Sequence, residues 1–274
     1  MTLARLSDVL QPALRHGYAV PGFVCLGWED ARAYALAAQA EAAPVILQAG
    51  PGARAHMPLP IWAALLHQLA RDVDIPLVPH LDHGMTAAEC HQALDLGFPS
   101  VMFDGSRLPL AENIAATAAI TAAAHAARAS CEGEIGFVGY AAGLPSTGTD
   151  PVEAARFARD TNVDAMAISV GNTHLQTETI ARIDRPRLQA IAAAAPGIPL
   201  VLHGGSGLSD ALRRDLSSTT PICKLNIGTE LRQTFGNALR QTLATDPALF
   251  DRLTILKTTE DPLTAAARAI LRTL

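Results

Sequence analysis

The sequence predicts an α/β protein folded as a single (β/α)8 barrel, and three observations support this. Eight short β-type runs recur along the 274 residues, and stretches rich in Ala, Leu, Arg and Glu with helical spacing separate them. Alternating strands and helices favour a parallel sheet, and eight such units in a chain of this length favour a closed barrel. No linker or composition break divides the chain, so one domain is expected over residues 1–274.

The predicted strands differ in how clearly the sequence marks them. The third, seventh and eighth are the clearest, whereas two Glu residues interrupt the fifth. An open doubly wound sheet is the alternative, but its Gly-rich phosphate turn would follow the first strand, where GFVCLGWED matches G-x-G-x-x-G poorly. In order, the runs are GYAVPGFV (17–24), APVILQAG (43–50), IPLVPHLD (75–82), PSVMFDGS (99–106), ASCEGEIG (129–136), VDAMAISV (163–170), IPLVLHGG (198–205) and PICKLNIGT (221–229).

Charge and cysteine usage limit the partners and the compartment. The net charge is −5 and no basic block is present, which argues against nucleic acid or an anionic membrane as a partner. The four cysteines are far apart and form no C-x-x-C pair, which favours a reduced, cytoplasmic setting. The first 20 residues lack a signal-peptide pattern. The apolar stretch 114–130 is rich in Ala and contains Thr, His and Arg, so a helix of a soluble protein is expected there and not a membrane span.

Polar and ionisable side chains follow six consecutive predicted strands. Because the carboxyl ends of barrel strands meet at one face, these side chains are expected to share a cleft. In chain order they are His80, Asp82 and His83, then Asp104, Glu132 and Glu134, then His174, His203, and finally Asn226 and Thr229.

Imidazoles at this rim indicate a metal site. Three imidazoles with an open coordination position are the usual ligands of a catalytic zinc ion. A single His after a strand is more often structural, but several of them with carboxylates at one end favour a shared function. Side chains alternate along a strand, so Asp82 and His83 are expected on opposite sides unless the strand bends. A metal ligand and a separate acid/base residue would then lie next to each other.

The stretch HGGSG (203–207) indicates an anion site. Its glycines let backbone N–H groups approach an anion, and Ser206 adds a hydroxyl. With Asn226 and Thr229 on the next strand, it resembles the phosphate site that barrels build after their seventh and eighth strands.

Five motifs, in this order, resemble the class II, metal-dependent ketose-bisphosphate aldolases, which include fructose- and tagatose-bisphosphate aldolases. They are HLDHG, CEGEIG, VGNTH, LVLHGGSGL and CKLNIGTEL, and GYAVPGF, SVMFDGS and LPLAENI also fit. The resemblance implies a TIM barrel, a sugar phosphate substrate with a donor of the dihydroxyacetone-phosphate type, and a homodimer or homotetramer.

The resemblance also implies a role for each matching residue. A catalytic Zn2+ would be bound by His83, His174 and His203, and Asp82 would transfer the proton at the hydroxyl of the cleaved bond. Asp104 and Glu134 match positions used for a second divalent ion or an alternative zinc position; a monovalent cation is a further cofactor expectation. The donor phosphate would be held by Gly204, Gly205, Ser206, Asn226, Gly228 and Thr229.

The chain departs from the family pattern at the catalytic loop. There the family has a Glu that handles the proton on the enediolate carbon, and Ala142 stands in its place. Candidate substitutes are Asp150, Glu153 and Glu178.

Other departures lie at the substrate site. Leu175 replaces the Gly after the second metal His, Val24 and Gly50 replace an Asn and a Ser or Thr, and the D-P-R-x-Y pattern near the C-terminus is missing. The hypothesis is therefore a zinc aldolase acting on a substrate other than fructose 1,6-bisphosphate, with a smaller or unphosphorylated aldehyde. The alternative is a metal-dependent isomerase, epimerase or other lyase acting through an enediolate. A non-catalytic barrel subunit is disfavoured, because it would not need both Asp82 and the three His.

Overall fold

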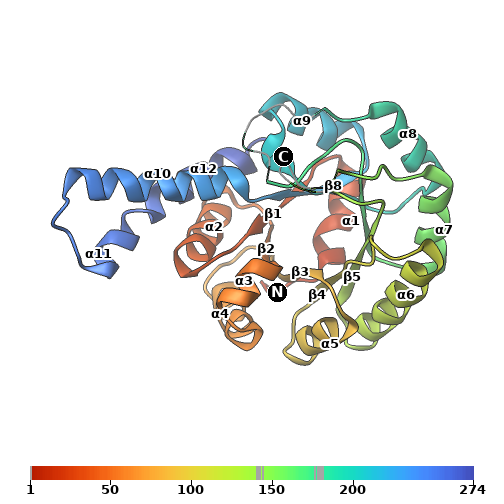
Figure 1. Cartoon of the computed structure of the whole chain (residues 1–274), viewed down its shortest axis with the longest axis horizontal. Helices are drawn as coiled ribbons and strands as arrows, with labels where there is room; N and C mark the ends of the chain where they lie inside the picture. Colours follow the sequence, from red (N-terminus) through yellow and green to blue (C-terminus); the bar gives the residue numbers. More distant parts are fainter. Residues whose placement is uncertain (1, 140–142, 144, 176, 178–181) are drawn as a thin grey trace.

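A closed barrel of eight parallel strands forms the centre of the protein (Figure 1). The structure, a computed structural model, describes residues 2–139, 143, 145–175, 177 and 182–274. Neighbouring strands pair in sequence order, and β1 closes the barrel against β8. Each predicted run contains one strand, which confirms the predicted fold class. The strands are β1 (Val20–Val24), β2 (Val45–Ala49), β3 (Leu77–Gly84), β4 (Ser100–Phe103), β5 (Ser130–Ile135), β6 (Ala165–Ile168), β7 (Leu200–Leu202) and β8 (Ile222–Ile227).

Helices surround the barrel, as the alternating pattern predicts. Between the strands lie α2 (Trp28–Glu41), α3 (Pro51–His56), α4 (Leu59–Arg71), α5 (Ala87–Asp95), α6 (Leu110–Ala126), α7 (Pro151–Thr161), α8 (Arg185–Ala194) and α9 (Asp210–Thr219), with a 3-10 turn, η1 (Gly205–Gly207), before α9. None of the helices in the described part of the chain is long and apolar enough to cross a membrane.

Helix α1 (Leu6–His16) closes the end of the barrel at which the strands begin. Its apolar residues Leu6, Val9, Leu10 and Ala13 are buried against side chains of the barrel interior, and the helix contacts β1, β5, β6 and β8. With this end filled by apolar side chains, the opposite end is left for a polar cleft.

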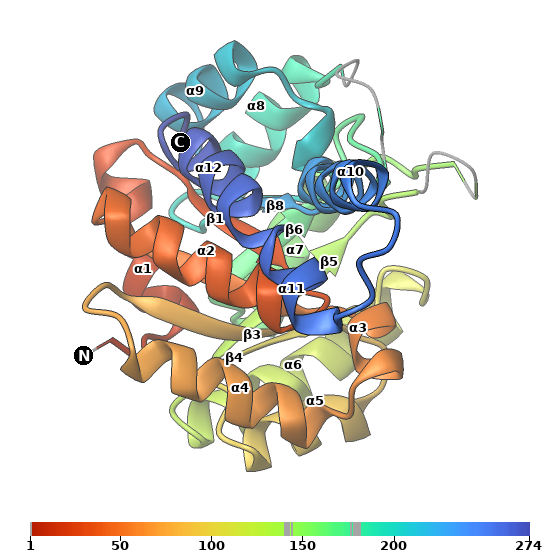
Figure 2. The same ribbon diagram turned by 90° about the vertical axis from the view of Figure 1, so that its left-hand side faces the viewer.

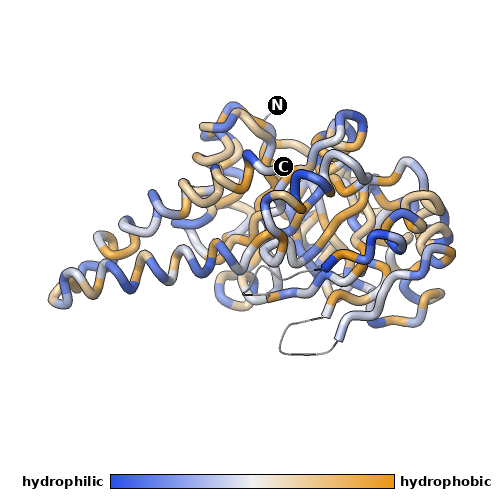
Figure 3. Tube along the Cα trace, turned by 90° about the horizontal axis from the view of Figure 1, so that it is seen from above, coloured by the Kyte–Doolittle hydropathy of each residue, from blue (hydrophilic) through white to orange (hydrophobic). Residues whose placement is uncertain are grey.

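The C-terminal helices form an arm beside β1. Helix α10 (Thr229–Thr245) projects from the barrel, α11 (Arg252–Lys257) lies at its far end, and α12 (Glu260–Leu271) returns to pack on α2 (Figures 1 and 2). Only Leu231 of α10 is buried, and Figure 3 shows hydrophilic and hydrophobic residues alternating along the arm. The first turn of α10 lies at the cleft, so this helix links the arm to the site.

The packing of α1 predicts a large effect of truncating Leu10. Leu10→Ala removes a fully buried side chain and leaves a cavity, so the free energy of unfolding should fall by about 2–5 kcal/mol. Urea denaturation measures this, with Arg15→Ala, an exposed change on the same helix, as the control. A loss below about 1 kcal/mol would show that α1 does not contribute to the core.

Candidate active site

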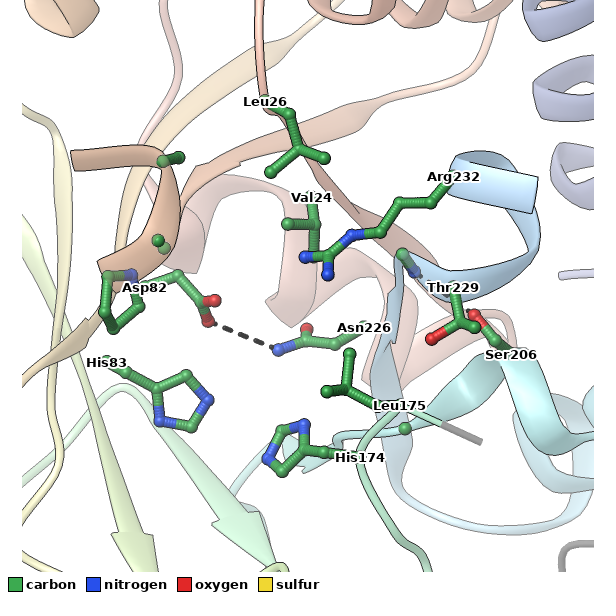
Figure 4. A pocket seen from close by; sticks show the side chains of 16 residues that line it. Val24, Leu26, Asp82, His83, His174, Leu175, Ser206, Asn226, Thr229 and Arg232 are labelled. Atoms are coloured by element: carbon green, nitrogen blue, oxygen red, sulfur yellow. Dashed lines mark hydrogen bonds between the residues drawn. The ribbon is translucent and has the colours of Figure 1, made fainter. Parts of the chain in front are cut away.

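The site begins with an irregularity in β3. Leu81 pairs with Val101 and Gly84 with Phe103, so β3 has one residue more than β4 over this stretch. His83 adopts a left-handed backbone conformation with φ 49°. This bulge provides the bend that the sequence required, and both Asp82 and His83 line one cavity (Figure 4).

Arg54 of α3 holds the bulge in place. Its guanidinium donates to the carbonyl oxygens of Ala49 at 2.6 Å, Asp82 at 2.7 Å and His83 at 3.0 Å, and pairs with Glu89 at 3.2 Å. These bonds satisfy carbonyl groups that the regular strand ladder would otherwise bind. Sequence reasoning did not find Arg54, because its partners are backbone atoms that no side-chain pattern reveals.

Three imidazoles face one another above the bulge. The ring centroids of His83, His174 and His203 are 5.2, 4.7 and 5.3 Å apart, and one nitrogen from each ring lies within 4.8 Å of the others. They come from β3, from the segment after β6 and from the end of β7. The structure therefore brings the three predicted metal ligands together.

Carboxylates orient two of these rings. Asp104 accepts from His83 Nδ1 at 2.7 Å, and Glu132 lies 3.2 Å from His203 Nε2. The second nitrogen of each ring, His83 Nε2 and His203 Nδ1, is then available to bind a metal ion. Metal-binding histidines are commonly oriented in this way by a carboxylate bonded to the other ring nitrogen. His203 Nδ1 and Glu134 Oε2 are buried without a hydrogen-bond partner among the described residues and lie 3.9 Å apart. A divalent cation fits this donor set, because it would bind both atoms.

A second group of ligand atoms shares His83. His83, Asp104 and Glu134 each offer an atom within 4.8 Å of the others, so the two predicted acidic positions also lie at the site. Burial raises the pKa of Glu134 to about 7, although the positive charge on His203 acts to lower it. A metal ion nearby would favour its ionised form.

The charges of the site favour an ionised Asp82. Burial alone would raise the pKa of Asp82, but positive charge on His83, His203 and Lys224 lowers it below its usual value. Burial also opposes charge on His83, yet the carboxylates of Asp82, Asp104 and Glu134 outweigh burial and raise its pKa to about 10. A cation that binds His83 must therefore displace a proton.

Lys224 lies in a buried network beneath the imidazoles. Its Nζ donates to Glu132 at 2.6 Å and lies 3.3 Å from His80 Nε2, while His80 Nδ1 contacts Ser100 at 2.7 Å. Lys224 is fully buried and does not line the cavity. Its amine is therefore not placed to form a Schiff base with a substrate in the cavity.

The predicted anion site lies between the end of β7 and the start of α10. Gly204 has φ 71°, and a Cβ atom there would lie 2.2 Å from the carbonyl oxygen of Thr173. Ser206 Oγ accepts from the N–H groups of Gly228 at 3.2 Å and Glu230 at 3.4 Å. The start of a 17-residue helix thus lies next to a glycine turn, and the positive end of the helix dipole there suits an anion.

The cavity has a volume of about 250 Å³. Its lining includes Gly204, Ser206, Asn226, Gly228 and Thr229 on the side of β7 and β8, while Gly205 is buried behind them. Asn226 Nδ2 lies 3.5 Å from Asp82 Oδ1 (Figure 4). The opposite side consists of Val24, Leu26, Gly50, Pro51, Gly52 and Ala53.

The residues considered for the catalytic loop can be placed only in part. Ala142 and Glu178 lie outside the described residues. Asp150 caps α7 by accepting from the N–H groups of Val152 and Glu153, and Glu153 is exposed in the first turn of that helix. Among the described residues, neither Asp150 nor Glu153 lines the cavity.

The fold and this cleft define a metal-dependent lyase of the barrel type. The family model described as "Fructose-bisphosphate aldolase class-II" matches residues 4–274, and the chain belongs to this family. It is therefore a class II aldolase, and members of this family typically depend on zinc. The predicted family and enzyme class are confirmed.

Relatives show how similar the chain is to known members. It is 35% identical over 249 residues to a fructose-bisphosphate aldolase of Streptococcus pyogenes, covering 88% of this chain and 84% of that protein. It is 34% identical over 266 residues to the 6-phospho-5-dehydro-2-deoxy-D-gluconate aldolase of Shouchella clausii, covering 94% and 89%. The crystal structure of the YdjI aldolase of Escherichia coli K12 matches with a TM-score of 0.87 and 26% identity, covering 99% of this chain and 96% of that one.

The hydrogen bonds from Arg54 to the bulge of β3 predict that Arg54 supports metal binding. Arg54→Ala leaves the carbonyl oxygens of the bulge without their partner, so metal affinity should fall by roughly 10- to 100-fold. Metal titration by calorimetry measures this, with Arg71→Ala, an exposed change on α4, as the control. Unchanged affinity in a folded Arg54→Ala protein would contradict the positioning role.

Proposed function

We propose that this class II aldolase cleaves and forms a carbon–carbon bond in a ketose phosphate, using a dihydroxyacetone-phosphate-type donor and an aldehyde other than glyceraldehyde 3-phosphate. The observation that supports this most directly is the convergence of three imidazoles from separate segments next to the ionised carboxylate of Asp82.

The metal ligands in this proposal are His83, His174 and His203, with Asp104 and Glu134 as the acidic positions of a second or alternative ion. A divalent ion held there, Zn2+ in the family's typical case, supplies Lewis-acid stabilisation of the enediolate charge. Asp104 and Glu132 keep the rings of His83 and His203 in orientation through the hydrogen bonds described above.

Asp82 moves the proton at the bond that breaks. In the cleavage direction its carboxylate takes the proton of the hydroxyl on the carbon that becomes the aldehyde, while the electron pair of the broken bond passes to the donor fragment. In the synthesis direction Asp82 returns that proton. Its lowered pKa keeps it ionised at neutral pH, and Asn226 lies 3.5 Å from it to orient the carboxylate.

The donor phosphate binds at the end of β7 and the start of α10. Gly204, Gly205 and Gly228 leave room for the backbone to approach, and Ser206, Asn226 and Thr229 provide polar side chains. The Ser206 hydroxyl, which accepts two N–H groups at the start of α10, lies where a phosphate oxygen would bind.

The aldehyde side supports a compact acceptor. Val24 and Gly50 lack the polar side chains common in the family, so this wall offers fewer partners to an extended, hydroxyl-rich or phosphorylated aldehyde. The relative from Shouchella clausii is named for a substrate other than fructose bisphosphate, so the family includes such enzymes.

The wider setting of the enzyme is also a proposal. One domain, a cytoplasmic location and a homodimer or homotetramer fit the chain, and the projecting arm exposes Phe250 and Leu253, which a second copy would cover.

The proposed proton transfer predicts the effect of changing Asp82. Asp82→Asn keeps the shape of the side chain but cannot accept the hydroxyl proton, so kcat should fall by roughly 100-fold or more. Metal content, measured by atomic emission, should equal that of the unchanged protein. Full turnover in a metal-loaded Asp82→Asn protein would remove Asp82 from the mechanism.

Removing the metal separates the metal-dependent reaction from background activity. Dialysis against a chelator should abolish turnover, and zinc should restore it.

With ketose phosphates as substrates, release of an aldehyde indicates an aldolase, whereas formation of an isomer indicates the isomerase alternative. Cleavage of fructose 1,6-bisphosphate as efficient as that of other ketose phosphates would contradict the proposed acceptor.

A further inference from the structure

One buried cation lies behind the turn η1. Arg213 belongs to α9, and its side chain is buried. Its guanidinium donates to the carbonyl oxygen of Gly205 at 3.0 Å and pairs with the carboxylate of Glu230. Neither Arg213 nor Glu230 lines the cavity, so Arg213 can act on a ligand there only through the groups that it binds.

The bond to Gly205 fixes the orientation of one peptide group. In a trans peptide the carbonyl oxygen of one residue and the N–H of the next point in opposite directions, and the described part of the chain has no cis peptide bond. Because Arg213 binds the Gly205 carbonyl from α9, the N–H of Ser206 points away from α9. Ser206 lines the cavity (Figure 4), and no described residue accepts a hydrogen bond from its N–H. This N–H is therefore available to a ligand.

The turn itself does little to hold this peptide group. Gly204 has φ 71°, and Gly205 has no side chain to restrict rotation of the backbone. A larger residue cannot stiffen the turn, because a Cβ atom on Gly205 would lie 3.0 Å from the carbonyl oxygen of Asn226. Apart from Arg213, the Gly205 carbonyl accepts only from the N–H of Leu208, at 3.2 Å, among the described residues. The support for the peptide group therefore comes mainly from α9.

The pair with Glu230 gives Arg213 a second possible effect. Glu230 lies in the first turn of α10, where an unpaired carboxylate would repel a bound anion. Arg213 balances this charge, so loss of Arg213 could weaken anion binding through charge alone. A test must separate this electrostatic effect from the orientation of the peptide group.

We propose that Arg213 is a positioning residue for the donor, which holds the Gly205–Ser206 peptide group so that the Ser206 N–H is directed at the donor phosphate. A donor whose direction is fixed in advance binds more tightly, because the ligand does not have to order the turn. This inference rests on the proposed function, since it concerns the donor phosphate of that reaction.

Donors with and without a phosphate test the role of Arg213. The zinc-loaded enzyme and its variants are assayed for aldol synthesis with glycolaldehyde and either dihydroxyacetone phosphate or dihydroxyacetone. The variants are Arg213→Met, the double variant Arg213→Met/Glu230→Gln, and the control Arg214→Met, an exposed change on the same helix. Methionine fills the space without donating, and the double variant leaves no unpaired carboxylate that could prevent folding.

The expected loss is confined to the phosphorylated donor. Arg213→Met should raise the KM for dihydroxyacetone phosphate by roughly 10- to 100-fold, as for one hydrogen bond to a charged group, and change kcat/KM for dihydroxyacetone by less than about twofold. The double variant should keep most of this loss, because the Gly205 carbonyl still lacks its partner, and Arg214→Met should match the unchanged enzyme. An unaltered KM for dihydroxyacetone phosphate in Arg213→Met, an equal loss with both donors, or full recovery in the double variant would overturn the proposal.

Binding of inorganic phosphate separates this inference from the proposed function. Calorimetry measures the affinity without turnover, and NMR reports the amide proton of Ser206, whose resonance phosphate should move in the unchanged enzyme but not in Arg213→Met. An unchanged enzyme that neither binds phosphate nor prefers the phosphorylated donor would contradict the proposed donor. Equal phosphate affinity and an equal Ser206 shift in the unchanged enzyme and Arg213→Met would contradict the role of Arg213 alone.

Discussion

The active site depends on one extra residue in β3. In a regular strand Asp82 and His83 would point to opposite sides, and the metal ligand and the acid/base residue could not share a cavity. The bulge and the left-handed conformation of His83 turn both side chains inward. That conformation costs about 1–2 kcal/mol for a residue with a side chain, and the hydrogen bonds of Arg54 to the neighbouring carbonyls offset the cost. The chemistry therefore follows from backbone geometry as well as from the identity of the two residues.

The sequence predicted the fold because its signals are local. Each strand is a short apolar run bounded by turn residues, and the carboxyl ends of parallel strands must meet, so His83, His174 and His203 were expected to lie together. The sequence did not show the bulge itself; it showed only that the strand must bend if Asp82 and His83 are to share a cavity. Arg54 could not be found, because it binds backbone carbonyls 28 and 29 residues away.

The site also explains why β5 has the weakest strand pattern in the sequence. Its two Glu residues interrupt an apolar run, and they are two positions apart, so both point into the barrel. Glu132 is nearer the start of the strand and bonds to Lys224 and His203, while Glu134 faces the metal ligands. An isolated buried charge would cost several kcal/mol, and the Lys224–Glu132 pair reduces this cost. The pairing also keeps Glu132 ionised, so that it accepts from His203 Nε2 and leaves Nδ1 for a metal ion.

The two sides of the cavity depart from the family pattern in different ways. Leu175 replaces a glycine, yet its backbone keeps a left-handed conformation with φ 55°, so the geometry next to the metal ligand His174 is the one that a glycine would adopt. At Val24 and Gly50 the change is chemical, because the polar groups themselves are missing and no described neighbour on that wall replaces them. At Leu175 the departure therefore changes the side chain and leaves the left-handed backbone next to His174 unchanged. On the side of Val24 and Gly50 the departure removes the polar groups themselves, which is why the proposed difference from the family concerns the aldehyde and not the metal chemistry.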